Sequence, residues 1–264
     1  MNEKMVPIKQ AFEGKRAFIA FVTAGDPSIE RTEEYILRMV RAGADLIEIG
    51  IPFSDPTAEG PVIQEANIRA LRGGVTVSKI FEMVGRVRPK VDVPLVFMTY
   101  LNPVYHYGYG AFFARCHEVG VSGIILPDLP FEEKGPVAEA AAVHGVDVVS
   151  LIAPTSKERI GMIAAGAQGF VYLVSSMGVT GVRRSIQTDV REMVDTVKRY
   201  TDVPVAVGFG IHTPEQAAQI SAYADGVIVG SAIVKLIAEH GADAGDEVEA
   251  YVRGMKGAIT CKSV

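Results

Sequence analysis

The stretch Ala42-Gly43-Ala44-Asp45-Leu46-Ile47-Glu48-Ile49 decides the fold, because versions of it return along the chain. It joins the end of a helical segment, a glycine and a short apolar run that contains isoleucine. The related segments are 119–126, 144–149, 165–172 and 223–229. Short apolar runs of this kind are typical of parallel strands covered on both faces, and glycine is common where the preceding helix ends. The recurrence therefore indicates a repeated strand–helix unit.

Three more segments have the same strand-like character. They are 17–22, 91–98 and 201–208. Between the apolar runs lie segments with helical periodicity, such as the stripe of Ile36, Met39 and Val40 before Gly43. Eight strands that alternate with helices predict an α/β fold, a (βα)8 TIM barrel, with an open doubly wound sheet as the alternative.

The length of the chain also fits one barrel. It has 264 residues, and roughly 250 are usual for this fold. Two ordinary domains would fit the same length, but no linker or low-complexity stretch separates two halves. We therefore expect a single domain over residues 1–264, with an extra N-terminal helix.

The composition narrows the classes of function. A formal net charge of −5 argues against a nucleic-acid surface, so an anionic ligand would be held by local backbone donors. The two cysteines and five histidines show no metal-ligand or redox spacing. The polar N-terminus is not a secretory signal, and no apolar run approaches a membrane span. We expect a cytoplasmic protein without a metal site or a membrane contact.

The second strand carries a carboxylate at Glu48. Alternate residues of a strand face opposite sides, so Ile47 and Ile49 would pack against helices. Glu48 would then point into the barrel together with Leu46. Apolar surroundings raise the pKa of a carboxyl group, which suits a general acid/base. The alternative is a buried glutamate that is held by Lys or Arg.

The loop after this strand, residues 52–61, carries two more carboxylates, Asp55 and Glu59. Active sites of such barrels lie on the loops that follow the strands. Two carboxylates that converge on one small substrate would allow proton transfer at two positions. The alternative is a solvated loop whose acids cap helices, and the loop by itself favours that interpretation slightly.

The sixth predicted strand ends at Tyr172. This tyrosine either hydrogen-bonds a substrate group or is a partly buried core residue, and its position does not decide between the two. The polar, glycine-containing loop 175–184 follows it and is long enough to act as a lid.

Glycines follow the seventh and eighth strands, in Gly208-Phe209-Gly210 and Gly230-Ser231. A helix start follows at Thr213-Pro214-Glu215-Gln216, with Thr as the N-cap and Pro at the first position. Loops after strands seven and eight, with a short helix N-terminus, form the usual phosphate site of these barrels. Together with Gly181 the pattern predicts a phosphate site, with glycines needed only for tight turns as the alternative.

Together these residues resemble the tryptophan synthase alpha chain family. The segments that carry the resemblance are Phe21–Pro27, Ile47–Pro56 continuing to Gly60–Gln64, Met98–Tyr100 with Asn102–Pro103, Pro127–Pro130, Gly178–Gly181, Gly208–Ile211 and Gly230–Val234. The likeness covers nearly all residues from about 5 to 260.

The resemblance implies a lyase reaction of tryptophan biosynthesis, in which indole-3-glycerol phosphate is cleaved to indole and glyceraldehyde 3-phosphate. This retro-aldol step needs no metal or organic cofactor. Glu48 matches the family's catalytic glutamate, which moves protons at the indole carbon and the glycerol hydroxyl. Glu59 occupies the position of an aspartate that steadies the indole nitrogen, and Tyr172 matches a tyrosine that contacts the substrate.

Other matched positions are implied to bind the substrate. Those that line the indole side are Phe21, Tyr100, Leu126 and Phe209. Those that match the phosphate site are Gly181, Gly208, Gly210, Gly230 and Ser231. Thr180 matches a threonine that ties the closing lid loop to the catalytic loop.

The chain departs from the commonest family pattern at Glu59, whose side chain is one methylene longer than Asp. A displacement of about 1 Å can cost on the order of 100-fold in rate if nothing compensates for it. Thr57 and Ser176-Met177 also differ from a widespread version that has an Arg near the start of the lid. These differences bear on lid motion and coupling more than on the reaction.

The resemblance also implies a partner, a β subunit that consumes indole with its own pyridoxal phosphate in an α2β2 complex. Asp55, Pro56 and Asn102 fall at matching interface positions. Three other functions stay open at this point. The chain could be another sugar-phosphate barrel such as an isomerase, a non-catalytic barrel that activates a β-type partner, or a stand-alone lyase that releases free indole.

Overall fold

Eight parallel strands form a closed barrel in the computed structural model, which describes residues 5–154, 159–175, 183–208 and 210–260. The strands are β1 (Ala17–Thr23), β2 (Leu46–Gly50), β3 (Leu95–Met98), β4 (Gly123–Ile125), β5 (Asp147–Ile152), β6 (Val171–Val174), β7 (Val205–Gly208) and β8 (Gly226–Val229). Each strand pairs with the next, and β1 closes on β8 through the register Ala17↔Gly226. The predicted barrel is therefore confirmed, and the open sheet is excluded.

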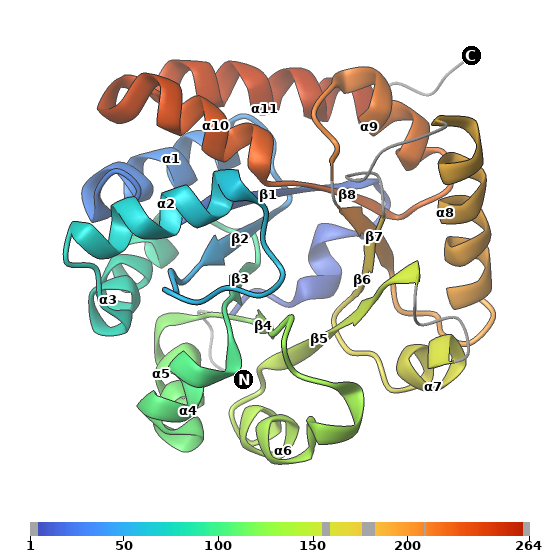
Figure 1. Cartoon of the computed structure of the whole chain (residues 1–264), viewed down its shortest axis with the longest axis horizontal. Coiled ribbons are helices and arrows are strands. Elements are labelled where there is room, and N and C mark those ends of the chain that lie inside the picture. Colours follow the sequence, from blue (N-terminus) through green and yellow to red (C-terminus); the bar gives the residue numbers. More distant parts are fainter. Residues whose placement is uncertain (1–4, 155–158, 176–182, 209, 261–264) are drawn as a thin grey trace.

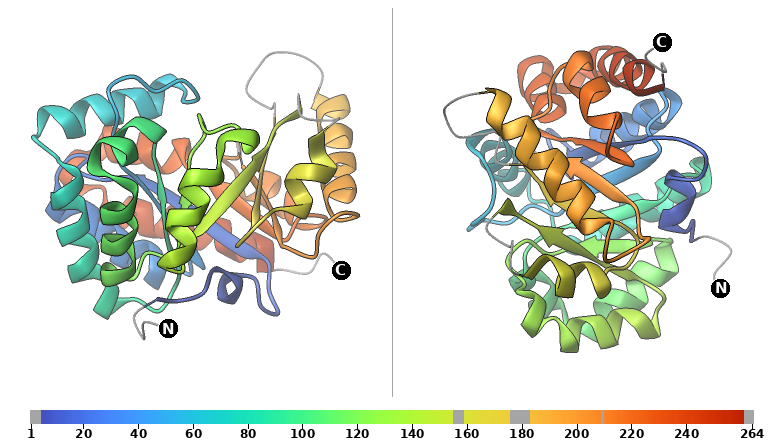
Figure 2. Two further views of the ribbon diagram at one scale, coloured as in Figure 1. Left: turned by 90° about the horizontal axis from the view of Figure 1, so that it is seen from below. Right: turned by 90° about the vertical axis from the view of Figure 1, so that its right-hand side faces the viewer.

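Helices surround the barrel, as Figures 1 and 2 show from three directions. They are α1 (Ile29–Arg41), α2 (Pro61–Arg72), α3 (Val77–Val87), α4 (Leu101–Tyr107), α5 (Tyr109–Val119), α6 (Gly135–Val143), α7 (Ile160–Ala165), α8 (Arg183–Val197), α9 (Pro214–Ser221), α10 (Ser231–His240) and α11 (Gly245–Thr260). Short 3-10 helices are η1 (Ile8–Ala11), η2 (Arg88–Lys90), η3 (Phe131–Glu133) and η5 (Gly241–Asp243).

The strands separate an outer core from an inner one. Ile47 and Ile49 belong to the outer core, between strands and helices, whereas Leu46 belongs to the core inside the barrel. The alternation predicted for β2 is therefore correct, and it directs Glu48 inward. The extra N-terminal helix is the four-residue η1, whose Ile8 and Ala11 complete the inner core.

Asp45 joins three elements at the start of β2. Its carboxylate accepts a hydrogen bond from the backbone N–H of Phe18 on β1 at 2.7 Å. It also accepts one from Lys256 Nζ on α11 at 2.6 Å and pairs with Lys15 Nζ at 2.8 Å. The side chain is buried, so these contacts replace its lost hydration and fix the last helix against the first two strands.

We expect Asp45→Ala to lower the free energy of unfolding by about 3 kcal/mol, because it leaves the buried N–H of Phe18 without its acceptor and removes the carboxylate that pairs with Lys15 and Lys256. Urea denaturation measures this change. The matched control is Asp246→Ala, which removes an ion pair to Arg38 whose acidic partner is 90% exposed. The control should change stability by no more than about 0.5 kcal/mol, and equal losses in both variants would contradict the assigned role of Asp45.

Candidate functional site

A cavity of about 380 Å³ opens beside the carboxyl ends of the strands. Phe21 of β1, Glu48 of β2 and Tyr172 of β6 form its inner wall. Glu59, from the loop after β2, lines it from above. The sequence therefore places two carboxyl groups and a phenol in one cavity, as expected for loops and strand ends of this fold.

Glu48 is enclosed by apolar neighbours. In the sheet it is in register with Phe21 on one side and Val96 on the other, and it is only 1% exposed. Its Oε2 atom has no hydrogen-bond partner, and no Lys or Arg pairs with it in the part of the chain that the structure describes. Burial, and to a smaller extent the charge of Glu59, raises the pKa of Glu48 to about 8. Among the described residues, no basic partner holds this glutamate.

Glu59 is held in place by its surroundings. Asn67 Nδ2 donates a hydrogen bond to Glu59 Oε2 at 2.8 Å, and Gln64 Nε2 donates one to the backbone oxygen of Glu59 at 2.8 Å. The backbone N–H of Ala58 donates to the hydroxyl of Tyr100 at 3.0 Å. Burial raises the pKa of Glu59, while the Asn67 hydrogen bond lowers it. Tyr100 thus anchors the loop, in addition to the predicted place beside the indole.

The sequence does not single out Asn67 in advance. A usable signal exists, because Asn67 is the one polar member of the stripe on α2 that is otherwise made of Ile63, Ala66 and Ala70, all buried. A buried amide needs a hydrogen-bond partner. The Glu59 carboxylate, on the loop before α2, is the partner of the Asn67 amide.

Two glycines make room for the aromatic walls. A Cβ atom on Gly208 would lie 2.5 Å from the Tyr172 hydroxyl oxygen, and one on Gly50 would lie 2.6 Å from the Phe21 ring. Gly208, predicted at the phosphate site, therefore lies against Tyr172. Tyr172 is buried. This burial, and to a smaller extent the charge of the nearby Glu48, raises the pKa of Tyr172 well above its usual value.

Gly210, Gly230 and Ser231 line the same cavity, where α10 begins. Gly230 is the N-cap of α10 and Ser231 is the first residue of that helix, so its free backbone N–H groups and dipole lie at this end. Lys235, one turn further along α10, lines the same cavity and was not predicted. The capping box predicted at Thr213 and Gln216 is present at the start of α9.

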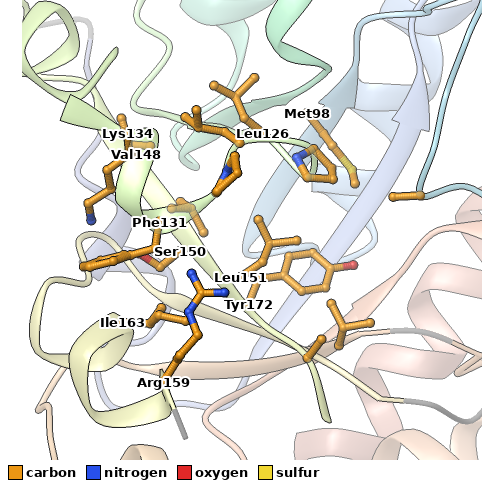
Figure 3. Close-up of a pocket in the computed structure, with 17 residues that line it drawn as sticks. Met98, Leu126, Phe131, Lys134, Val148, Ser150, Leu151, Arg159, Ile163 and Tyr172 are labelled. Carbon is orange, nitrogen blue, oxygen red and sulfur yellow. The ribbon is translucent and has the colours of Figure 1, made fainter. Parts of the chain in front are cut away.

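The remaining predicted positions fall into three groups. Asp55 and Asn102 are exposed and Pro56 is half-buried, and none of them lines the cavity. Leu126 lines a neighbouring cavity of about 340 Å³, which shares Ala58, Met98 and Tyr172 with the first (Figure 3). Thr180, Gly181 and Phe209 lie outside the described residues, as does most of the predicted lid.

The described ranges contain no group of three or more His, Cys, Asp or Glu side chains arranged to hold a metal ion. In the same ranges no helix is both long and apolar enough to cross a membrane.

Fold and cavity define the class: a (βα)8 barrel equipped for acid/base chemistry at the ends of its strands. The family model described as tryptophan synthase alpha chain matches residues 8–260. The chain is 44% identical to the tryptophan synthase alpha chain of Lacticaseibacillus casei over 258 residues, 98% of this chain and 97% of that one. It is 49% identical to that of Geobacillus kaustophilus over 221 residues, 83% of this chain and 82% of that one.

Solved structures agree with these sequence matches. The tryptophan synthase subunit alpha of Legionella pneumophila has a TM-score of 0.88 at 37% identity and covers 97% of this chain and 98% of its own. A chain of the tryptophan synthase α2β2 complex of Pyrococcus furiosus has a TM-score of 0.86 at 39% identity, over 92% of this chain and 99% of its own. The chain belongs to the tryptophan synthase alpha chain family. It is therefore a lyase of tryptophan biosynthesis.

The raised pKa of Glu48 predicts a specific dependence of stability on pH. The folded chain keeps this carboxyl protonated up to about pH 8, whereas the unfolded chain loses the proton near the ordinary value of 4.5. The folded state binds more protons in this window, so stability falls as pH rises, by at most about 1.4 kcal/mol per pH unit.

Glutamine cannot ionise, so Glu48→Gln should escape this loss. We expect the variant to gain stability relative to the parent chain as pH rises from 5 to 8. Urea denaturation of both chains at the two pH values measures the difference. Parallel pH profiles would show that folding does not raise the pKa of Glu48.

Proposed function

We propose that Glu48, Glu59 and Tyr172 carry out the cleavage of indole-3-glycerol phosphate in this cavity. The observation that carries the proposal is the buried Glu48 carboxyl, which faces the cavity and has no basic partner among the described residues. Its raised pKa keeps it protonated near neutral pH, so it can donate a proton to the indole carbon. The resulting carboxylate then accepts the proton of the glycerol hydroxyl as the carbon–carbon bond breaks, which leaves indole and an aldehyde.

Glu59 has a different task in this proposal. Its carboxylate accepts the hydrogen bond of the indole N–H and so stabilises the positive charge that develops on the protonated ring. Asn67 holds one oxygen of Glu59 in the cavity wall, which leaves the other oxygen for the substrate. This anchoring compensates for the extra methylene relative to Asp, because it fixes the longer side chain at a defined depth.

The two ends of the site suit the two ends of the substrate. The phosphate would lie at Gly210, Gly230 and Ser231, where the N-terminus of α10 offers donors. The indole ring would lie near Met98, which lines both this cavity with Phe21 and the adjoining one with Leu126. The predicted place of Tyr100 beside the indole stays a prediction, because Tyr100 lines neither cavity. The roles of Thr180, Gly181 and Phe209 stay predictions from the sequence.

We infer a tryptophan synthase β subunit as the partner. The structure from Pyrococcus furiosus that matches this chain is titled as a mutually activated α2β2 complex. Asp55 and Asn102 are exposed and do not line the cavity. Their exposure is compatible with the interface positions predicted for Asp55, Pro56 and Asn102. Pyridoxal phosphate would belong to that partner, since proton transfers alone accomplish the cleavage in this chain. One domain over residues 1–264 and a cytoplasmic location stay predictions.

The direct test is release of indole from indole-3-glycerol phosphate by the purified chain, alone and with a β subunit added. We expect release that rises when the β subunit is present. Glu48→Gln should reduce it at least 100-fold under both conditions, because general acid/base catalysis contributes about 10²- to 10⁴-fold.

The outcomes separate the open alternatives. Fast release without a partner would identify a stand-alone lyase. A folded Glu48→Gln variant with near-normal turnover would show that another group moves the protons. No release under either condition would point to a barrel of other specificity or to a non-catalytic activator.

A second prediction concerns Asn67. Asn67→Leu removes the donor that lowers the pKa of Glu59, so Glu59 would stay protonated to higher pH. We expect the acidic limb of the kcat/KM profile to move to higher pH and the maximum to fall by roughly 10- to 100-fold. The matched control is Gln64→Ala, which loses only a hydrogen bond to the Glu59 backbone. An unshifted profile in Asn67→Leu would remove Asn67 from the site.

A further inference from the structure

The cavity beside the proposed indole end continues beyond the space that an indole ring needs. It begins at Met98 and Tyr172, where it adjoins the Glu48 cavity, and extends past Leu151 to residues outside the barrel. Figure 3 shows Leu151 between Tyr172 and the guanidinium group of Arg159. The outer end lies between β5 and the elements η3 and α7, which supply Phe131 and Ile163.

The charge of this outer end is positive. Lys134 and Arg159 line it, and no carboxylate is among the described residues of its wall. Lys134 is half-buried; its Nζ donates to the backbone oxygen of Gly166 at 3.1 Å and lies 4.3 Å from the centre of the Phe131 ring. It forms no ion pair within the described ranges, and burial lowers its pKa. Arg159 pairs with Glu132, whose side chain is half exposed and does not line the cavity.

A buried hydroxyl group supplies a second, independent observation. Ser150 lines the outer end and is 7% exposed. Its Oγ atom has no hydrogen-bond partner among the described residues. An enclosed hydroxyl without a partner costs free energy that a polar ligand atom would recover. A cationic wall and an unsatisfied donor thus lie at the far end of an apolar passage.

We propose that this outer end, formed by Ser150, Lys134 and Arg159, accepts an acidic group on the benzene ring of the indole moiety. The substrate class then includes indoles that carry a ring carboxylate. The ring lies against Met98, Leu151 and Tyr172, and the carboxylate reaches the guanidinium group, which binds carboxylates through two parallel N–H donors. The inference rests on the proposed function, because it assigns the ring to the same cavity.

The reverse of the cleavage offers a simple test, because the probes are free indoles. Carbon 3 of the indole attacks the aldehyde carbon of glyceraldehyde 3-phosphate. A carbon–carbon bond forms, the ring carbon loses its proton, and the aldehyde oxygen gains one, so no other reactant is needed. The probes are indole, indole-5-carboxylate, indole-6-carboxylate and the corresponding neutral carboxamides, each measured as kcat/KM with the full chain.

We expect at least one carboxylate to be used within about tenfold of indole and better than the carboxamide of the same shape. Arg159→Met should lower kcat/KM for that carboxylate roughly tenfold and leave indole unchanged, since hydrogen bonds between charged groups are worth about one factor of ten or more. Ser150→Val puts two methyl groups in place of the hydroxyl at the outer end. It should lower kcat/KM for the indole carboxylates and carboxamides but not for indole.

Glu132→Gln serves as the control for the ion pair itself. It removes the partner of Arg159 but keeps the guanidinium group, so carboxylate use should be retained or increased. If Arg159→Met acted only by disturbing the local structure, Glu132→Gln would lower carboxylate use as well, which would overturn the proposal. Rejection of both carboxylates alongside use of the carboxamides would overturn it too.

A failure of the proposed lyase function can be distinguished from a failure of the proposal for the outer end. A chain that does not condense even plain indole would contradict the proposed function. In that case calorimetric titration with the two indole carboxylates still decides the outer end: binding that weakens in Arg159→Met supports it, and equal or absent binding in both chains excludes it.

Discussion

The chemistry proposed for this molecule depends on the enclosure of one carboxyl group in a closed barrel. Glu48 lies in register between Phe21 and Val96, so the hydrogen-bonded sheet itself, and not a mobile loop, keeps it away from water. The Glu48 side chain cannot turn outward, because side chains alternate along β2 and its neighbours Ile47 and Ile49 occupy the outer core. A buried carboxyl group is more stable in its protonated form. With a pKa of about 8, Glu48 keeps a proton near neutral pH that it can donate in a reaction.

The second carboxyl group has the opposite surroundings. Glu59 is on a loop, receives a hydrogen bond from Asn67 and has its backbone held by Gln64. Two acids in one cavity with unequal solvation are driven toward different protonation states, which is how neighbouring carboxyls take the roles of proton donor and charge stabiliser. Tyr100 also helps to position Glu59, because its hydroxyl accepts a hydrogen bond from the backbone N–H of Ala58, the residue before Glu59. In the proposed function, packing around the loop thus sets the different roles of Glu48 and Glu59.

Strand-level features could be predicted from the sequence because they obey short-range rules. Glycine followed by an apolar run marks five of the eight strands, and the period of two directs Glu48 inward. Features that depend on how separate elements meet could not be predicted: the helix residue Asn67 reaches Glu59, and Lys235 enters the cavity from α10. Gly208 illustrates the limit, since a glycine indicates that space is needed but not that Tyr172 lies against it; its predicted place at the phosphate site stays a prediction.

A chain with a net charge of −5 does not attract an anionic substrate through its overall field, so local groups must provide the attraction. The proposed phosphate end does so with the N-terminus of α10 and with Lys235 on the same helix. The outer end beyond Leu151 does so with Lys134 and Arg159, while the acidic groups Glu48 and Glu59 lie in the adjoining cavity. In the proposed function, the phosphate end thus favours the one negative group of indole-3-glycerol phosphate, which orients this elongated substrate before any bond changes.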